Sequence, residues 1–124
     1  MKTFKLIVAG SRGFSNVDVF NLYMQETVRH VMLKYNQPTI EIVSGMARGA
    51  DAMGAQFAEL NELKLYKFPA EWDKYGKSAG YRRNAEMGRM ADSLVAFWDG
   101  KSRGTQHMIE TIRDLNKELI IVNY

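Results

Sequence analysis

Short apolar runs alternate with longer amphipathic segments along this chain. Each run ends at glycine, proline or a polar residue, a pattern typical of strands buried on both faces of a sheet. Between the runs, apolar residues recur at spacings of three and four, which predicts amphipathic helices. The predicted strands are residues 6–9, 40–43, 65–68, 94–97 and 119–122, and the predicted helices run from 16 to about 35, from after 51 to about 61, over 81–91, and from after 105 to about 117.

This regular alternation predicts right-handed β-α-β crossovers and a parallel sheet with helices on both faces. The expected fold is α/β, a Rossmann-like three-layer sandwich with a mainly parallel five-stranded sheet. With 124 residues and 46% hydrophobic content, residues 1–124 are expected to form one domain. Residues 69–80 are polar and rich in aromatic side chains, and we expect them to form a loop. Function is expected beyond the carboxyl ends of the strands, where the strand order reverses.

Composition limits the kinds of partner and reactive site that the chain can have. The net charge is +3 and basic residues are interspersed with acidic ones, which does not resemble a nucleic-acid-binding tail. The absence of cysteine excludes disulfides, thiolate metal sites and cysteine nucleophiles. The first apolar run stops at Gly10, too early for a signal peptide or a membrane span, so we expect a cytoplasmic protein with no membrane contact. Nothing in the sequence indicates a metal site or a separate cofactor.

Three strand-to-helix junctions, at residues 10–13, 44–51 and 99–105, combine glycine with small hydroxyl residues and arginine. Parallel strands place all three at the same end of the sheet. Glycine permits close approach to a ligand, helix N-termini favour anions, and arginine clamps phosphate with paired N–H groups. Neither the six-residue dinucleotide fingerprint nor a Walker A motif is present. The candidate ligand-binding residues are Gly10, Ser11, Arg12, Ser44, Gly45, Arg48, Gly49, Asp51, Trp72, Arg83, Asn84, Ser102, Gly104 and Thr105.

Each candidate also has a purely structural interpretation. A glycine after a strand is often only a turn, and a serine there is often only a helix cap. Asp51 can cap its helix or hold a ribose hydroxyl, and Asp99 has the same two interpretations. Trp72, Tyr75 and Tyr81 can stack on a base or simply cover the pocket.

The motifs resemble a known family over nearly the whole chain. They are Gly10-Ser11-Arg12, Ser44-Gly45-x-Ala47-x-Gly49-x-Asp51, Phe68-Pro69-Ala70-x-Trp72, Gly80-x-x-Arg83-Asn84-x-x-Met87 and Gly100-x-Ser102-x-Gly104-Thr105. In this order they resemble the YspA-like branch of the SLOG superfamily, a group best described as predicted ligand-binding domains. The resemblance implies a single SLOG-type nucleotide-binding domain with a Rossmann-like fold.

Two relatives within that superfamily frame the alternatives. The LOG-type phosphoribohydrolases cleave the base from a nucleoside monophosphate, and Arg83, Met87, Gly104 and Thr105 match their motifs. Asn84 replaces their lysine, however, and Met108 stands where their catalytic glutamate is expected. Glu110 lies two residues further along the helix and is turned away by about 200°. The DNA-processing protein A family, which binds single-stranded DNA, resembles this chain in the loop over residues 44–51.

Three functions follow from these observations. The leading hypothesis is a sensor or ligand-binding domain for a nucleotide or a nucleotide-derived molecule, such as an ADP-ribose-like compound or a nucleotide sugar. The runner-up is a hydrolase of an N-glycosidic or phosphate bond, with Asp51, Glu71 or Asp99 as general base. Single-stranded nucleic-acid binding ranks third, because the positive excess is small. The apolar helix faces also allow a homodimer.

Overall fold

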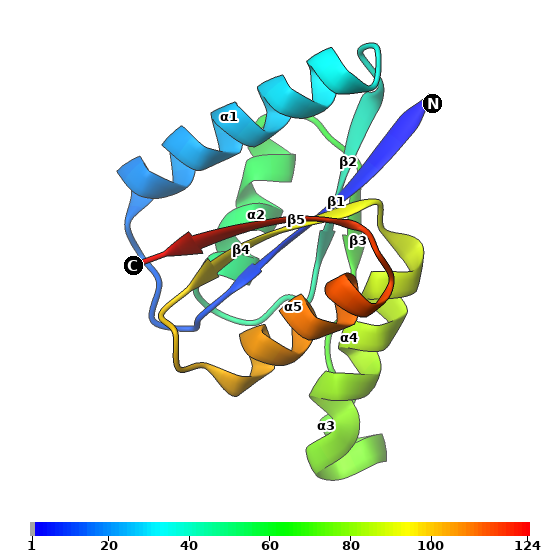
Figure 1. Cartoon of the computed structure of the whole chain (residues 1–124). Helices are drawn as coiled ribbons and strands as arrows, with labels where there is room; N and C mark the ends of the chain where they lie inside the picture. The colour runs from blue at the N-terminus through cyan, green and yellow to red at the C-terminus, as the bar shows by residue number, and fades with distance from the viewer. Residues whose placement is uncertain (1) are drawn as a thin grey trace.

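All the predicted strands are present in one sheet of the computed structural model, which describes residues 2–124 (Figure 1). The strands are β1 (Thr3–Gly10), β2 (Thr39–Ser44), β3 (Leu65–Lys67), β4 (Ser93–Trp98) and β5 (Glu118–Asn123). Their order is β3-β2-β1-β4-β5, and each neighbouring pair is parallel. The predicted α/β fold is therefore confirmed, and the sheet is parallel throughout.

The strand order reverses between β1 and β4. From β1 the chain moves outward to β2 and β3, and it then returns to add β4 and β5 on the other side of β1. In open parallel sheets, a crevice forms beyond the carboxyl ends of the two strands at such a reversal. The loops that follow β1 and β4 therefore border this crevice.

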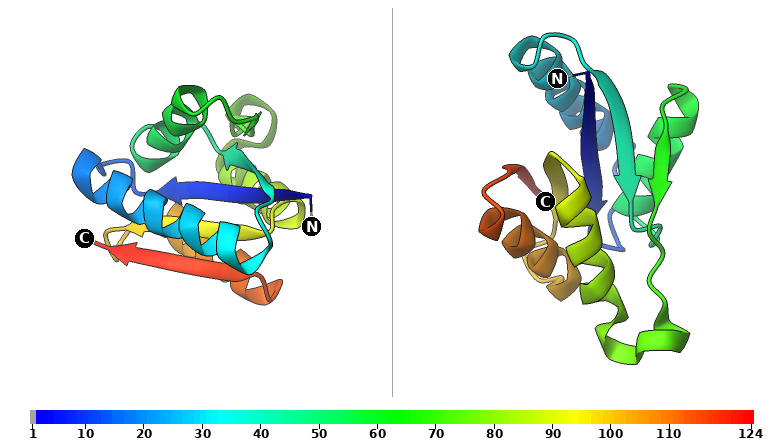
Figure 2. Two further views of the ribbon diagram at one scale, coloured as in Figure 1. Left: turned by 90° about the horizontal axis from the view of Figure 1, so that it is seen from above. Right: turned by 90° about the vertical axis from the view of Figure 1, so that its right-hand side faces the viewer.

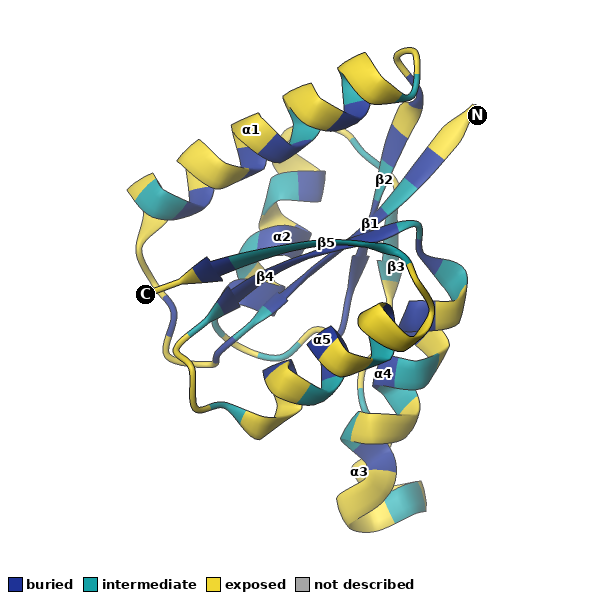
Figure 3. Ribbon diagram, in the orientation of Figure 1, coloured by how far each residue is buried: buried dark blue, intermediate teal, exposed yellow. Residues whose placement is uncertain are grey.

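Alternate residues of β1 point into two separate cores. Leu6 and Val8 pack on one face with residues of α1 (Val17–Lys34) and α2 (Ala50–Leu60). Ile7 and Ala9 pack on the opposite face with residues of α4 (Ala79–Met90) and α5 (Arg103–Asp114). Figure 3 shows the buried strands between helices whose outer faces are exposed. This two-sided burial explains why the strands form continuous apolar runs.

The segment predicted as a loop, residues 69–80, contains helical turns. Trp72–Tyr75 forms the short helix α3, and Gly76–Ser78 forms the 3₁₀ turn η1, which leads into α4. Neither turn buries a side chain, so no apolar periodicity marks them in the sequence. Figure 2 shows α3 projecting beyond the sheet at the start of α4.

Side chains cap the start of α1 and the end of α4. The Asn16 side chain accepts a hydrogen bond from the backbone N–H of Val19 at the start of α1. At the end of α4, the Lys117 ammonium donates to the carbonyls of Gly88 and Ala91, at 2.7 and 2.6 Å. It also reaches the carbonyl of Arg89, at 3.2 Å. A cation at this position stabilises both the free carbonyls and the negative end of the helix dipole.

Across the described part of the chain, residues 2–124, none of the helices combines the length and the hydrophobicity needed to cross a bilayer.

Candidate functional site

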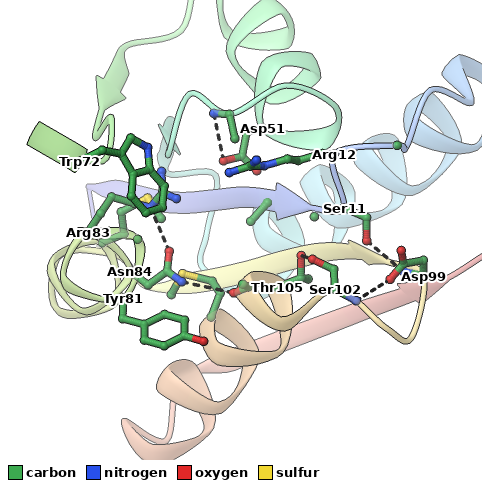
Figure 4. Close-up of a pocket in the computed structure, with 18 of the residues that line it drawn as sticks. Ser11, Arg12, Asp51, Trp72, Tyr81, Arg83, Asn84, Asp99, Ser102 and Thr105 are labelled. Atoms are coloured by element: carbon green, nitrogen blue, oxygen red, sulfur yellow. Dashed lines mark hydrogen bonds between the residues drawn. The ribbon is translucent and has the colours of Figure 1, made fainter. Parts of the chain in front are cut away.

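A pocket of about 500 Å³ opens at the reversal of strand order, between the loops that follow β1 and β4. Figure 4 shows Trp72 and Tyr81 at one end of this pocket and Ser11, Asp99 and Ser102 at the other. The lining residues are Ala9, Gly10, Ser11, Arg12, Gly13, Ala47, Asp51, Trp72, Lys77, Gly80, Tyr81, Arg83, Asn84, Met87, Asp99, Ser102, Gly104, Thr105 and Met108. The three glycine-containing loops thus contribute to one pocket, together with the first turns of α4.

Helices α2 and α5 begin at the pocket without a side-chain cap. The N-cap residue of α2 is Gly49, which has no side chain, and that of α5 is Ser102, whose hydroxyl makes no hydrogen bond to the helix backbone. By contrast, Asn16 caps α1, which begins away from the pocket. Gly104 and Thr105, in the first turn of α5, line the pocket directly. Free N–H groups and the positive ends of the helix dipoles therefore favour an anion here.

Backbone hydrogen bonds anchor the guanidinium of Arg83. Its Nη1 donates to the carbonyl of Gly45 at 2.6 Å and to the carbonyl of Phe68 at 3.3 Å, while its Nε donates to Oδ1 of Asn84 at 3.1 Å. Its Nη2 has no hydrogen-bond partner within residues 2–124. Burial lowers the pKa of Arg83, although a guanidinium remains charged at neutral pH. A fixed cation with free donors therefore lines the pocket.

Asp51 is a buried carboxyl in the first turn of α2, with 5% of its surface exposed. Desolvation raises the pKa of Asp51 to about 6, against the opposing attraction of Arg83 and Arg12. Its Oδ2 accepts a long hydrogen bond, 3.4 Å, from the backbone N–H of Ala47. Asp51 therefore exchanges its proton close to neutral pH, beside two guanidiniums.

A chain of hydrogen bonds joins the loops after β1 and β4. The backbone N–H of Asp99 donates to Oγ of Ser11 at 3.1 Å. Oδ1 of Asp99 accepts from the backbone N–H groups of Ser102 and Lys101, at 2.8 and 2.9 Å, and these bonds hold the pKa of Asp99 below its usual value. The hydroxyls of Ser102 and Thr105 lie 3.2 Å apart. The carboxylate of Asp99 thus shapes the loop that leads into α5.

Asn84 links α4 to α5 at the base of the pocket. Its Nδ2 lies 3.2 Å from the carbonyl of Gly104 and 3.2 Å from Nδ1 of His107. The ring of His107 stacks on Tyr81 with centroids 4.2 Å apart. Burial lowers the pKa of His107, which favours the neutral imidazole as acceptor for the Asn84 amide. Asn84 therefore fixes the position of Arg83 relative to the start of α5.

Within residues 2–124, no three acidic or histidine side chains gather closely enough to hold a metal ion.

Comparisons with known proteins identify one distant relative. The Gene 61 protein of Mycobacterium phage D29 is 40% identical to this chain over an alignment of 72 residues, which covers 53% of this chain and 58% of that protein. The match thus spans less than two thirds of the relative's length. No family model and no solved structure matches the chain.

Most of the candidate residues line the pocket, and four do not. Ser44 is buried, and its hydroxyl donates to the backbone carbonyl of Asp51 and accepts from the N–H of Met46. Gly45 and Gly49 leave room for neighbours, because a Cβ at Gly45 would lie 2.8 Å from Oδ2 of Asp51 and one at Gly49 would lie 2.6 Å from the carbonyl of Arg12. Arg48 lies on an adjoining cavity. These four residues shape the loop after β2.

Of the three candidate general bases, Asp51 and Asp99 line the pocket, whereas Glu71 is exposed and lies outside it. The backbone carbonyl of Glu71 accepts from Lys74 and Tyr75 at the start of α3. Met108 is buried under the pocket, and Glu110 is exposed and bonded to Gln106. The position at which the resemblance to the phosphoribohydrolases leads us to expect a glutamate is therefore occupied by a buried thioether.

Sequence reasoning missed Lys77, an exposed cation on the pocket rim. It lies in Gly76-Lys77-Ser78-Ala79-Gly80, directly before the predicted helix. A lysine between glycines at a helix start is a usable signal for an anion site. Within residues 69–80, the sequence predicts a role only for Glu71 and for the aromatic residues Trp72 and Tyr75.

Proposed function

We propose that this chain binds a nucleotide or nucleotide-derived ligand as a sensor or ligand-binding domain, and that it belongs to the YspA-like branch of the SLOG superfamily. One observation supports the proposal above all. At the reversal of strand order, uncapped starts of α2 and α5 share one pocket with Arg12, Arg83 and Lys77. This combination matches a phosphate group better than a neutral ligand.

In this proposal, each group of the ligand has a matching part of the pocket. The phosphate lies between the loop over residues 10–13 and the start of α5, where Arg12 and the free N–H groups neutralise it. The carboxyl of Asp51 accepts a ribose hydroxyl. The rings of Trp72 and Tyr81, both about half exposed, offer faces to a base.

Arg12 provides the sharpest test, because it is exposed and makes no side-chain hydrogen bond in the described part of the chain. Arg83 is less suitable, since its loss also leaves the carbonyls of Gly45 and Phe68 without their donor. We expect Arg12→Ala to weaken binding of AMP, ADP or ADP-ribose by about tenfold or more, as for the loss of a charge-assisted hydrogen bond.

The measurement is thermal-shift titration followed by calorimetry, because a ligand that binds only the native state raises the melting temperature by mass action. Arg113→Ala is the matched control, because it removes an exposed arginine from the last turn of α5, at the opposite end of that helix from the pocket. Absence of binding by the unmodified protein, or equal losses in both variants, would contradict the proposal. Binding of single-stranded DNA with a steep salt dependence would favour a nucleic-acid function instead.

Hydrolysis of an N-glycosidic or phosphate bond is the second candidate, and Asp51 is the observation that favours it. A carboxyl with a pKa of about 6 that faces a pocket with two arginines can accept a proton from an attacking water. Chromatography of the nucleotides after the same incubations separates the two functions. A ligand recovered intact supports a sensor. A ligand that the unmodified protein cleaves and the Asp51→Asn variant does not cleave supports a hydrolase.

A further inference from the structure

A second cavity, of about 510 Å³, adjoins the pocket. The two cavities share Arg12, Ala47, Trp72 and Arg83 as lining residues, so the same side chains form the boundary between them. The remaining wall of the second cavity comes from residues 45–48 and 69–70, which follow β2 and β3. The proposed function leaves this second cavity without a role.

The two cavities follow the carboxyl edge of the sheet. The first lies beyond β1 and β4, and the second lies beyond β2 and β3, so together they extend along four neighbouring strands. A mononucleotide at the strand reversal occupies only the first of these positions. A ligand that extends along the strand ends from the reversal point reaches both.

The walls of the second cavity differ from those of the first. Met46, Pro69, Ala70 and the half-exposed indole of Trp72 present apolar surface, and Arg48 is the cation that only this cavity contains. Met46 adopts a φ of 62°, which is uncommon for a residue with a long side chain. The N–H of Met46 donates to Oγ of Ser44, which holds the loop in this conformation. An apolar wall with one indole and one guanidinium suits a planar heterocycle.

The boundary between the cavities carries positive charge. Arg12 and Arg83 both lie there, and Figure 4 shows Arg12 beside the carboxyl of Asp51. The positive charges of both guanidiniums oppose the rise in the pKa of Asp51, which means that both lie near its carboxyl. A bridging pyrophosphate at this boundary contacts two cations while its two ends extend into separate cavities.

We propose that the two cavities form one bipartite site for a pyrophosphate-bridged dinucleotide. One nucleoside occupies the pocket at the strand reversal, with its base beside Tyr81. The pyrophosphate extends from the loop over residues 10–13 to the boundary, where Arg12 and Arg83 hold it. In the dinucleotide, the second base lies against Trp72 and Met46 beside Arg48. This inference rests on the proposed function, because it assigns the ligand of the same site. It adds the chemical class of the ligand and makes Arg48 a residue that determines specificity for dinucleotides over mononucleotides.

Arg48→Ala tests the inference, with diadenosine pyrophosphate and ADP as probes. Both probes contain a pyrophosphate, and the dinucleotide carries a second nucleoside where ADP carries an additional negative charge. Arg48 is exposed, and its side chain makes no hydrogen bond within residues 2–124, so we expect the melting temperature of the variant to remain unchanged. Arg113→Ala again serves as the control for loss of one exposed charge.

By calorimetry, the unmodified protein is expected to bind the dinucleotide at least about tenfold more tightly than ADP. In Arg48→Ala this advantage disappears while the affinity for ADP is unchanged. A dinucleotide that binds no more tightly than ADP to the unmodified protein overturns the inference, and so does an equal loss for both probes. If neither probe binds the unmodified protein, the proposed function itself fails. If ADP binds but the dinucleotide has no advantage, only the inference of a bipartite site fails.

Discussion

Asp51 shows at the scale of one residue how the fold changes ordinary side-chain chemistry. The carboxyl lies in the first turn of α2. Burial disfavours its charged form by more than the positive charges of Arg83 and Arg12 favour it, so the pKa of Asp51 rises from 3.8 to about 6. A raised pKa means that the folded chain holds this proton more tightly than the unfolded chain. The contribution of Asp51 to stability is therefore complete below about pH 4, and it is lost as the pH rises through 6.

We expect Asp51→Asn to increase the free energy of unfolding at pH 8 by up to about 3 kcal/mol, which is the cost of about two pKa units. Near pH 4.5 the gain is expected to be much smaller, because the native carboxyl is then protonated. Urea denaturation at both pH values measures the difference. Asp99→Asn is the control with the opposite sign, because hydrogen bonds from Ser102 and Lys101 stabilise that carboxylate in the folded state. A loss of stability at pH 8 in Asp51→Asn would contradict the expectation.

Helix α4 shows how one long side chain secures an element that carries the site. It positions Arg83 and Asn84, and its last turn is held by the ammonium of Lys117 on three carbonyls. Lys117→Met keeps the apolar stem and removes the three donors. We expect it to reduce the free energy of unfolding by about 1–3 kcal/mol.

The matched control for this element is Lys101→Met, since the exposed side chain of Lys101 has no hydrogen-bond partner in the described part of the chain. Urea denaturation compares both variants with the unmodified protein. Equal stability of the two variants would show that the contacts of Lys117 with α4 add nothing.

Elements with a buried face were predictable from sequence, and elements without one were not. Ile7 and Ala9 alternate along β1, and Met108 and Ile112 recur along α5, because both pairs face the same core. The turns α3 and η1 bury no side chain and leave no such pattern, although they carry Trp72 and Lys77 to the pocket. The site was predictable in outline, because parallel strands bring their following loops to one edge. The anchoring of Arg83 was not predictable, since it joins helix α4 to the carbonyls of Gly45 and Phe68 in two separate loops, and no sequence spacing encodes these contacts.

At the scale of the whole molecule, Gly10 is the point where three elements meet. It ends β1, and a Cβ at this position would meet the carbonyl of Phe97 in β4 and lie 2.7 Å from Cβ of Ala50 in α2. Gly13 lies in the same loop with open space around it. The close approach of β1, β4 and α2 therefore requires a residue without a side chain at position 10, but not at position 13.

We expect Gly10→Ala to lower the free energy of unfolding by about 1–3 kcal/mol, as overpacking of a tight contact does. It should also weaken ligand binding, because the same shift displaces the loop over residues 10–13. Gly13→Ala should change stability by less than about 0.5 kcal/mol. Chemical denaturation of the two variants side by side tests the contrast, and equal effects would show that the contact at Gly10 is not restrictive.

The position of β1 at the centre of the sheet has a consequence during protein synthesis. Leu6 pairs with Ser93, and Gly10 pairs with Phe97, so one edge of β1 receives its neighbour only after roughly ninety further residues are made. At ribosomal rates of about 5–20 residues per second, that edge stays open for on the order of ten seconds. Throughout this interval a strand of Leu6, Ile7 and Val8 exposes unpaired N–H and C=O groups together with apolar side chains. The nascent chain therefore has an unpaired, aggregation-prone strand edge until β4 leaves the ribosome.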